Sequence, residues 1–229
     1  MSARTQVTLA QFTSRVYDTL GNNSFWTSDE IRQYINSALR TWNSLTGYWH
    51  GRITYTTTPN TIYYCLPSTL VFGAHVEFNG VPITKSSIFD WDQADPHWAS
   101  KRGPAQEWSP IGIRIISLRP IDPAGGNSVT VDGVTVTPIL VNSNDYIDIG
   151  EEEFKSLVDY IHHVAAFKEG GQEFGSTVPL YKQLIASAGA KNEKLRASAL
   201  YRRVMGLDET SQRKYRRLKT ELNATVGMH

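Results

Sequence analysis

Residues 27–47 read TSDEIRQYINSALRTWNSLTG and contain the strongest helix signal in the chain. Thr27 and Glu30 have the spacing of a capping box, in which each side chain accepts a hydrogen bond from the other residue's backbone N–H. Apolar residues then recur every three or four positions, which places them on one face of a helix; they are Ile31, Tyr34, Ile35, Ala38, Leu39, Trp42 and Leu45. Gly47 follows where a glycine commonly ends a helix. The stretch predicts a long helix whose apolar face, with Trp42 on it, packs in a helical bundle.

Helical patterns also stand at both ends of the chain. Upstream, Thr8 and Gln11 form a second capping-box pair, and the predicted helix runs to the stop at Gly21. Downstream, Asp148 with Glu151 resembles an N-cap pair, and this helix is expected to continue to Gly170-Gly171. The three glutamates 151–153 fall on its first turn, where the helix dipole favours negative charge.

One more helix is predicted from Thr177, its expected N-cap, through Pro179 in the first turn to about Arg203. Gly189 is a weak point in it, costing about 1 kcal/mol relative to alanine. Residues 208–222 have helical composition but a thin apolar stripe, which indicates that they depend on a partner or stay mobile.

Between the helices, residues 52–148 are rich in β-branched and aromatic residues and in turn signals. Residues 52–67 read as two strands of a hairpin broken at Pro59-Asn60. Asn79-Gly80 and Asp132-Gly133 are two-residue turn signals, and each predicts a hairpin. The strands expected around these two turns and between them are residues 72–78, 81–83, 112–118, 128–131 and 134–141.

The predicted fold is therefore α+β, a helical bundle built from both chain ends with an inserted antiparallel all-β module. The expected domains are a bundle of residues 1–50 and 149–203, a β module of residues 51–148, and a basic C-terminal docking arm of residues 204–229. At roughly 150 residues per domain, a length of 229 residues fits one domain with an insertion.

Composition excludes several classes of protein. No apolar run approaches the ~18 residues of a membrane span, and the N-terminal residues lack the apolar core of a signal peptide. The single Cys65 excludes an internal disulfide framework and a multi-thiolate metal site. We expect a soluble, cytosolic globular chain with no cofactor and no membrane contact.

No stretch of the chain carries a convincing catalytic or metal-binding pattern. Residues 90–98, with three aspartates and His97, suggest a metal site, but they lack the glycine and distal glutamate of a calcium loop. A solvated, tryptophan-anchored surface loop is the favoured interpretation. His162 and His163 point about 100° apart on a helix, so partly buried helix residues are expected, with a hydrogen bond from His163 to Asp159. Cys65 reads as a small core residue.

Net charge is unevenly distributed along the chain. Residues 181–229 hold 11 Lys or Arg and 4 Asp or Glu, a net charge of +7, whereas residues 1–180 hold 12 and 18, a net charge of −6. The basic tail could neutralise phosphates, dock on an acidic protein surface, or remain a solvated helix without a partner. Tyr201 and Tyr215 are the only aromatic residues from position 201 onward, and no nucleic-acid-binding motif accompanies them, so protein docking is favoured.

The order of these features resembles the head-to-tail adaptor, or connector, proteins of tailed bacteriophages. The resemblance rests on FWTSDEIRQYINSALRTWNSLTGYW at residues 25–49, on WDQADPHWASKRGPAQEWSP at 91–110 and on ISLRPIDPAGG at 116–126. An acidic-capped helix with Tyr160, Ala165, Ala166 and Lys168 follows. The resemblance covers nearly the whole chain in the order of its elements.

The resemblance implies a structural, non-enzymatic subunit of the virion, present in the host cytoplasm during assembly. Such proteins form a ring, commonly of twelve subunits, that docks under the portal protein, extends the DNA channel without specific DNA binding, and receives a tail or nozzle protein. The large aromatic inventory (6 Trp, 11 Tyr and 8 Phe) suits subunit interfaces. The residues expected to dock on the portal are Tyr201, Arg202, Arg203, Leu207, Arg213, Tyr215, Arg216, Arg217, Leu218 and Leu222. Two other classes stay open: a nucleic-acid-binding protein, and an enzyme using Asp92, Asp95 or His97.

Overall fold

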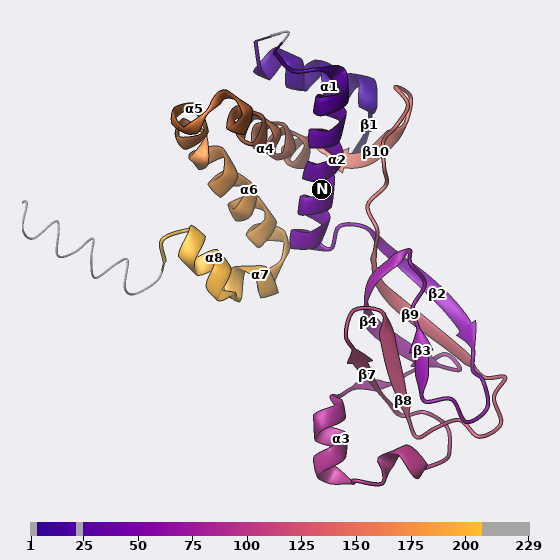
Figure 1. Cartoon of the computed structure of the whole chain (residues 1–229). Helices are drawn as coiled ribbons and strands as arrows, with labels where there is room; N and C mark the ends of the chain where they lie inside the picture. Colours follow the sequence, from indigo (N-terminus) through magenta and orange to yellow (C-terminus); the bar gives the residue numbers. More distant parts are fainter. Residues whose placement is uncertain (1–3, 22–24, 208–229) are drawn as a thin grey trace, which may run out of the picture. The chain divides into compact units, whose positions relative to one another are not determined.

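A computed structural model describes residues 4–21 and 25–207 and separates the chain into two compact units (Figure 1). The β unit is Gly47–Thr137, and the helical unit contains the chain on both sides of it. The chain is thus mixed α+β, as predicted. The second boundary predicted from the sequence is residue 148, because residues 138–148 share the β-branched character of the insertion.

The helical unit consists of helices from both chain ends and a two-stranded ribbon. Its elements are β1 (Arg4–Thr8), α1 (Leu9–Thr19), α2 (Ser28–Thr46), β10 (Tyr146–Gly150), α4 (Glu151–Glu169), α5 (Gly171–Ser176), α6 (Val178–Lys191), α7 (Glu193–Ala197) and α8 (Ala199–Val204). Their apolar faces meet in a core whose fully buried side chains include Phe12, Ile35, Trp42, Ile161 and Leu184.

Both predicted capping boxes are present. The Oε1 atom of Gln11 accepts a 2.9 Å hydrogen bond from the backbone N of Thr8, and the hydroxyl of Thr8 accepts one from the backbone N of Gln11. Thr27 and Glu30 repeat the arrangement at the start of α2, at 2.8 and 3.2 Å. Local signals of this kind therefore located the first two helices correctly.

The predicted N-cap of α4, Asp148, was wrong. Asp148 lies in β10, which pairs antiparallel with β1, so its backbone belongs to a ladder and not to a helix terminus. The N-cap position is occupied by Gly150, and no side chain caps the helix there. A β-carbon at Gly150 would lie 2.0 Å from a carboxylate oxygen of Glu153, so the end of this side chain would have to move to admit a larger residue. The acidic first turn at residues 151–153 is confirmed.

The single helix predicted from Thr177 to Arg203 is broken into three. The side-chain oxygen of Asn192 accepts hydrogen bonds from the backbone N of Lys194 and of Leu195, which ends α6 and starts α7. Ser198 in turn caps α8 through the backbone N of Tyr201. Asn and Ser side chains compete with the helical backbone in this way. The turns let α8 fold back onto α6.

The β unit contains two four-stranded sheets around one apolar core. The first has the order β2-β9-β4-β5 and the second β3-β8-β7-β6. The elements are β2 (His50–Thr56), β3 (Tyr63–Cys65), β4 (Leu70–Phe78), β5 (Val81–Pro82), β6 (Thr84–Lys85), α3 (Ile88–Ala94), a 3₁₀ turn (Trp98–Ser100), β7 (Glu107–Ile111), β8 (Ile115–Arg119) and β9 (Ser128–Thr135). The insertion is therefore neither all-β nor wholly antiparallel, since it holds α3 and the parallel pair β6–β7.

The two strands predicted as a hairpin in residues 52–67 do not pair with each other. β2 pairs with β9, and β3 pairs with β8 in the other sheet. The turn at Pro59-Asn60 carries the chain from one sheet to the other. Composition identified both strands, but the choice of partner depends on residues fifty or more positions away.

Of the two predicted turns, one is confirmed and one is wrong. Asn79 and Gly80 both have positive φ (51° and 78°), and they connect β4 to β5 as a hairpin. Asp132 and Gly133 instead lie inside β9, the strand between β2 and β4. A β-carbon at Gly133 would lie 2.1 Å from the carbonyl oxygen of Phe72, so the glycine permits close strand approach and makes no turn.

Candidate docking surface

The portal-docking residues expected from sequence divide between described and undescribed parts of the chain. Arg202, Arg203 and Leu207 are exposed at the end of the helical unit, with Leu207 48% exposed. Six others lie outside the described residues: Arg213, Tyr215, Arg216, Arg217, Leu218 and Leu222. The structure thus brings four of the ten expected residues, Tyr201 included, to one end of the helical unit.

The Tyr201 ring packs against α6 of the same chain. Gly189 of α6 has no side chain, and a β-carbon there would lie 2.2 Å from the Cε2 atom of the Tyr201 ring. Gly189 therefore provides the space into which α8 packs. The chain leaves α8 at Gly206, whose φ of +69° is the left-handed conformation that ends helices. The backbone N of Leu207 donates to the carbonyl oxygen of Arg202, which completes this C-cap.

Residues 90–98 form a helix and a turn, where sequence analysis predicted a surface loop. The tryptophan anchors are confirmed, because Trp91 and Trp98 are buried with ring centroids 4.9 Å apart. All three carboxylates have structural partners: Asp90 accepts from the hydroxyl of Ser87, Asp92 accepts from the indole N–H of Trp98, and Asp95 lies 2.7 Å from Lys101 Nζ. The hydrogen bond from Lys101 lowers the pKa of Asp95, followed by one from the backbone of His97. These contacts give the aspartates a structural role in the packing of residues 90–98.

His163 is buried, as predicted, but its hydrogen bond runs to α6. Nδ1 lies 2.9 Å from the hydroxyl of Thr177, rather than bonding Asp159 one turn away. Thr177 occupies the predicted N-cap position of α6, with Pro179 in the first turn, but its side chain makes no capping hydrogen bond, because its hydroxyl donates back to the carbonyl oxygen of Phe174. Burial, and then the neighbouring His162, lowers the pKa of His163. A neutral imidazole therefore joins α4 to the start of α6.

Cys65 is exposed, which corrects its prediction as a core residue. The alternation of β3 points Tyr64 inward, and so it points Cys65 outward. The thiol lies in a strand and is accessible to a labelling reagent.

The β unit carries one group of side chains with the donor types of a metal site. His75, Glu77 and Asp132 bring one ligand atom each to within 4.8 Å of one another. Arg52 already supplies the positive charge there, with its Nε 2.7 Å and one terminal nitrogen 2.8 Å from the two Asp132 oxygens. This bidentate pair lowers the pKa of Asp132, and the same guanidinium reaches Glu77 at 3.5 Å. The network is satisfied as a cross-strand ion pair.

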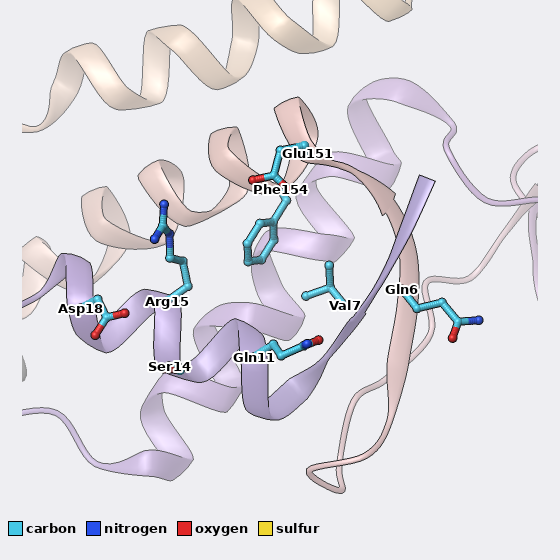
Figure 2. Close-up of a pocket in the computed structure, with 8 residues that line it drawn as sticks. All are labelled: Gln6, Val7, Gln11, Ser14, Arg15, Asp18, Glu151 and Phe154. Carbon is cyan, nitrogen blue, oxygen red and sulfur yellow. The ribbon is translucent and has the colours of Figure 1, made fainter. Parts of the chain in front are cut away.

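A shallow hollow of about 450 Å³ lies between β1, α1 and the start of α4 (Figure 2). Arg15 and Asp18 stand on α1, and Phe154 comes from α4. The ring of Phe154 packs edge-on against buried Phe12, at 4.9 Å between centroids. Gln11 at its edge is committed to the capping box. The hollow is a gap in the packing between β1, α1 and α4.

A second surface is apolar and was missed by sequence analysis. This aromatic groove, of about 540 Å³, is lined from α2, α4, α5 and α6 by Tyr34, Tyr160, His163, Phe167, Phe174 and Tyr181, together with Lys168 and two valines. Its rings are in contact: His163 stacks on Phe174 at 4.4 Å and on Tyr181 at 5.8 Å, while Phe167 meets Phe174 edge-on at 5.4 Å. The signal for it is present on α4, where residues 160, 163, 164 and 167 form a second stripe beside the core stripe.

Lys168 closes one end of the groove in a fixed position. Its Nζ donates to both oxygens of Glu30, at 2.8 and 3.0 Å, and to the carbonyl oxygen of Phe25 at 2.8 Å. This contact, with the backbone N–H of Thr27, lowers the pKa of Glu30 to about 2. The groove wall is thereby tied to the start of α2.

Aromatic rings at a surface, such as exposed Phe167 and the half-buried rings beside it, are frequent where proteins bind other proteins. Fold and surface together fit a binding or assembly subunit of α+β class. The chain belongs to the SU10 adaptor protein family, whose model matches residues 7–217. Family membership gives it a structural role as a bacteriophage adaptor, as the resemblance implied, with a place in the virion and contacts with portal and tail proteins in general. No curated protein matches the chain. No helix in the described ranges is both long enough and apolar enough to span a membrane.

Proposed function

We propose that this adaptor forms a closed ring, commonly of twelve copies, that docks beneath the portal protein and extends the DNA channel toward a tail or nozzle protein. The family match carries the proposal, because it covers residues 7–217 and therefore includes both units. The charge distribution supports it. A body with a net charge of −6 over residues 1–180 suits a channel wall, since fixed positive charge would bind passing DNA through its phosphates.

The docking arm is residues 204–229, and the ten residues named above make the contacts with the portal: seven lie in the arm, and Tyr201, Arg202 and Arg203 precede it in α8. Support comes from the end of the described chain: Arg202, Arg203 and Leu207 are exposed beside the glycine cap of α8. Beyond them the sequence supplies three more arginines with Tyr215, Leu218 and Leu222. A segment that becomes ordered on binding loses conformational entropy, so several apolar anchors and ion pairs must act together.

Deleting residues 207–229 tests this arm. We expect the deletion to leave the fold intact, judged by circular dichroism and thermal melting, and to abolish capture by the cognate portal. Charge reversal by Arg216→Glu and Arg217→Glu should weaken docking, and more strongly as salt is lowered, because charges are screened beyond about 8 Å at 0.15 M salt.

The matched control is Lys194→Glu with Arg196→Glu, which makes the same charge change on exposed residues of α7. This variant should bind the portal like the unaltered chain. A deletion that unfolds the protein would show that the segment belongs to the core. If the control variant binds the portal as weakly as the Arg216 and Arg217 variant, the weaker binding comes from the change in net charge and not from these two positions.

The basic tail also supports a second candidate, a nucleic-acid-binding role, because residues 181–229 carry a net charge of +7. The same deletion separates the two: loss of salt-dependent DNA binding with portal binding retained would favour nucleic acid. Ring formation is tested by mass photometry and negative-stain imaging of the chain alone and with portal. Only monomers in a stoichiometric mixture with the portal would refute the ring.

A further inference from the structure

The turn that joins β4 to β5 contains the one Asn-Gly dipeptide in the sequence, at Asn79 and Gly80. Asn-Gly deamidates readily, because glycine has no side chain to shield its backbone nitrogen. That nitrogen attacks Cγ of the asparagine and closes a succinimide ring, while the side-chain amide leaves as ammonia with the proton from the glycine nitrogen. Water then opens the ring to aspartate or isoaspartate. Both residues are exposed, so water reaches the turn.

The side chain of Asn79 is held at both of its polar atoms. Oδ1 accepts a 2.9 Å hydrogen bond from the backbone N of Ser128, and Nδ2 donates to Oδ1 of Asn127, also at 2.9 Å. The succinimide ring requires a negative ψ at Asn79, whereas its left-handed turn conformation, with φ of 51°, goes with ψ of about +47°. The turn and the side chain must therefore rearrange before the ring can close, which breaks these hydrogen bonds.

Asn127 is itself oriented by a buried carboxylate. Asp122, 4% exposed, accepts from Nδ2 of Asn127 at 2.7 Å and from the hydroxyl of Thr57 at 2.5 Å. Burial raises the pKa of Asp122, but the hydrogen bonds from Thr57 and Asn127 outweigh it and hold the pKa below its usual value. An ionised carboxylate only accepts hydrogen bonds. Nδ2 of Asn127 therefore faces Asp122, and its Oδ1 is left to face Asn79.

This network gives a role to the segment ISLRPIDPAGG at residues 116–126, which contains Asp122. The backbone N of Ala124 donates to Oδ1 of Asp122 at 3.1 Å, so the loop is folded around the carboxylate. The backbone N of Asn127 donates to the hydroxyl of Thr57 at 2.9 Å, which fixes the end of the loop where β9 begins. The loop thus presents Asn127 to the β4–β5 turn in one orientation.

We propose that Asn79 is a deamidation site that the fold keeps unreacted, because Asn127, oriented by Asp122, holds its side-chain amide. Asn127 and Asp122 are positioning residues, since neither forms a bond to the reacting atoms. The product would not fit this network. An aspartate at position 79 lacks the donor and would set a carboxylate oxygen against Oδ1 of Asn127, which cannot turn away without losing Asp122. The inference is independent of the ring and of the portal.

Mass spectrometry of the peptide that contains residues 79 and 80 tests this proposal on the full chain. The chain is incubated at mildly alkaline pH, both folded and unfolded in guanidinium chloride, and aspartate and isoaspartate are quantified over time. We expect the folded chain to react at least about tenfold more slowly than the unfolded chain. Asn127→Ala should raise the folded rate about tenfold, because one of the restraining hydrogen bonds is lost.

The matched control is Thr57→Val. It removes the hydroxyl that contacts Asp122 and the backbone of Asn127, but it leaves the hydrogen bond between Asn79 and Asn127. With both variants folded by circular dichroism, the control should deamidate at the rate of the unaltered chain. Equal rates in the folded and unfolded chain would overturn the proposal. Equal acceleration in the two variants would also overturn it, since general stability of the β unit would then be the cause.

A second measurement needs no variant and decides the question if Asn127→Ala fails to fold. The side-chain amide protons of Asn79 should exchange with solvent more slowly, by NMR of the unaltered chain, than those of exposed Asn144. Exchange at the same rate would show that the amide of Asn79 is not held, and the proposal would be wrong.

Discussion

Gly189→Ala should destabilise this protein, although the same change in an isolated helix would stabilise it. In the middle of α6, alanine gains about 1 kcal/mol over glycine from helix propensity. In the folded chain the new β-carbon would lie 2.2 Å from Cε2 of Tyr201 and 2.9 Å from its Cζ. Those distances are far inside van der Waals contact, so the ring must move and α8 must shift with it.

Overpacking of this kind costs about 1–3 kcal/mol. Subtracting the propensity gain leaves a net loss of up to about 2 kcal/mol in the free energy of unfolding. In a Tyr201→Ala background the steric conflict is absent, and Gly189→Ala should then stabilise by about 1 kcal/mol. The sign of the effect therefore inverts between the two backgrounds.

Urea unfolding of the four chains, the unaltered protein, both single variants and the double variant, measures this coupling as a double-mutant cycle. The midpoints should shift in opposite directions when Gly189→Ala is added to the two backgrounds. Equal stabilisation in both would refute the packing of Tyr201 on α6. It would also return Tyr201 to the set of side chains free to contact the portal.

Three further changes test other parts of the structure. Trp42→Ala removes a fully buried ring and should lower the free energy of unfolding by about 3–5 kcal/mol in urea titration; an unchanged melting temperature would place Trp42 on the surface. Gly133→Ala puts a β-carbon 2.1 Å from the backbone oxygen of Phe72 and should cost about 3 kcal/mol, seen as selective loss of β-unit amide signals. Glu30 should titrate near pH 2 by NMR and at a higher pH in Lys168→Met, which keeps the hydrogen bonds from Thr27. Since the folded pKa is the lower one, the stability that this carboxylate contributes is present above pH 4.5 and is lost as pH falls toward 2.

The elements that the sequence predicts correctly are those whose signal is local. A capping box lies within four residues and an Asn-Gly turn within two, so α1, α2 and the turn at Asn79-Gly80 were found. Strand pairing is not local. β2 pairs with a strand almost eighty residues away, and the tight approach of β4 makes Gly133 a spacer inside β9. Asp-Gly often makes a turn, but at Asp132-Gly133 pairing with β2 on one side and β4 on the other keeps the chain extended.

The two candidate surfaces, the basic tail and the aromatic groove, also differ in how much of each can be seen in the sequence. The basic tail is visible in composition alone, although most of its expected docking residues lie outside the described chain. The aromatic groove combines side chains from four helices, and only the stripe on α4 that begins at Tyr160 and ends at Phe167 is visible before folding. Periodicity shows that such a stripe is apolar, but it cannot tell whether the core or a partner covers it.

The first and last strands of the β unit are hydrogen-bonded neighbours, with His50 opposite Val134. The chain thus leaves the helical unit and returns to it through a single pair of adjacent strands, a connection that a short loop could replace. An adaptor built this way is modular: the inserted unit could be exchanged for another while the helical unit keeps its own core. Joining Thr46 to Pro138 by a few flexible residues would make such a reduced chain.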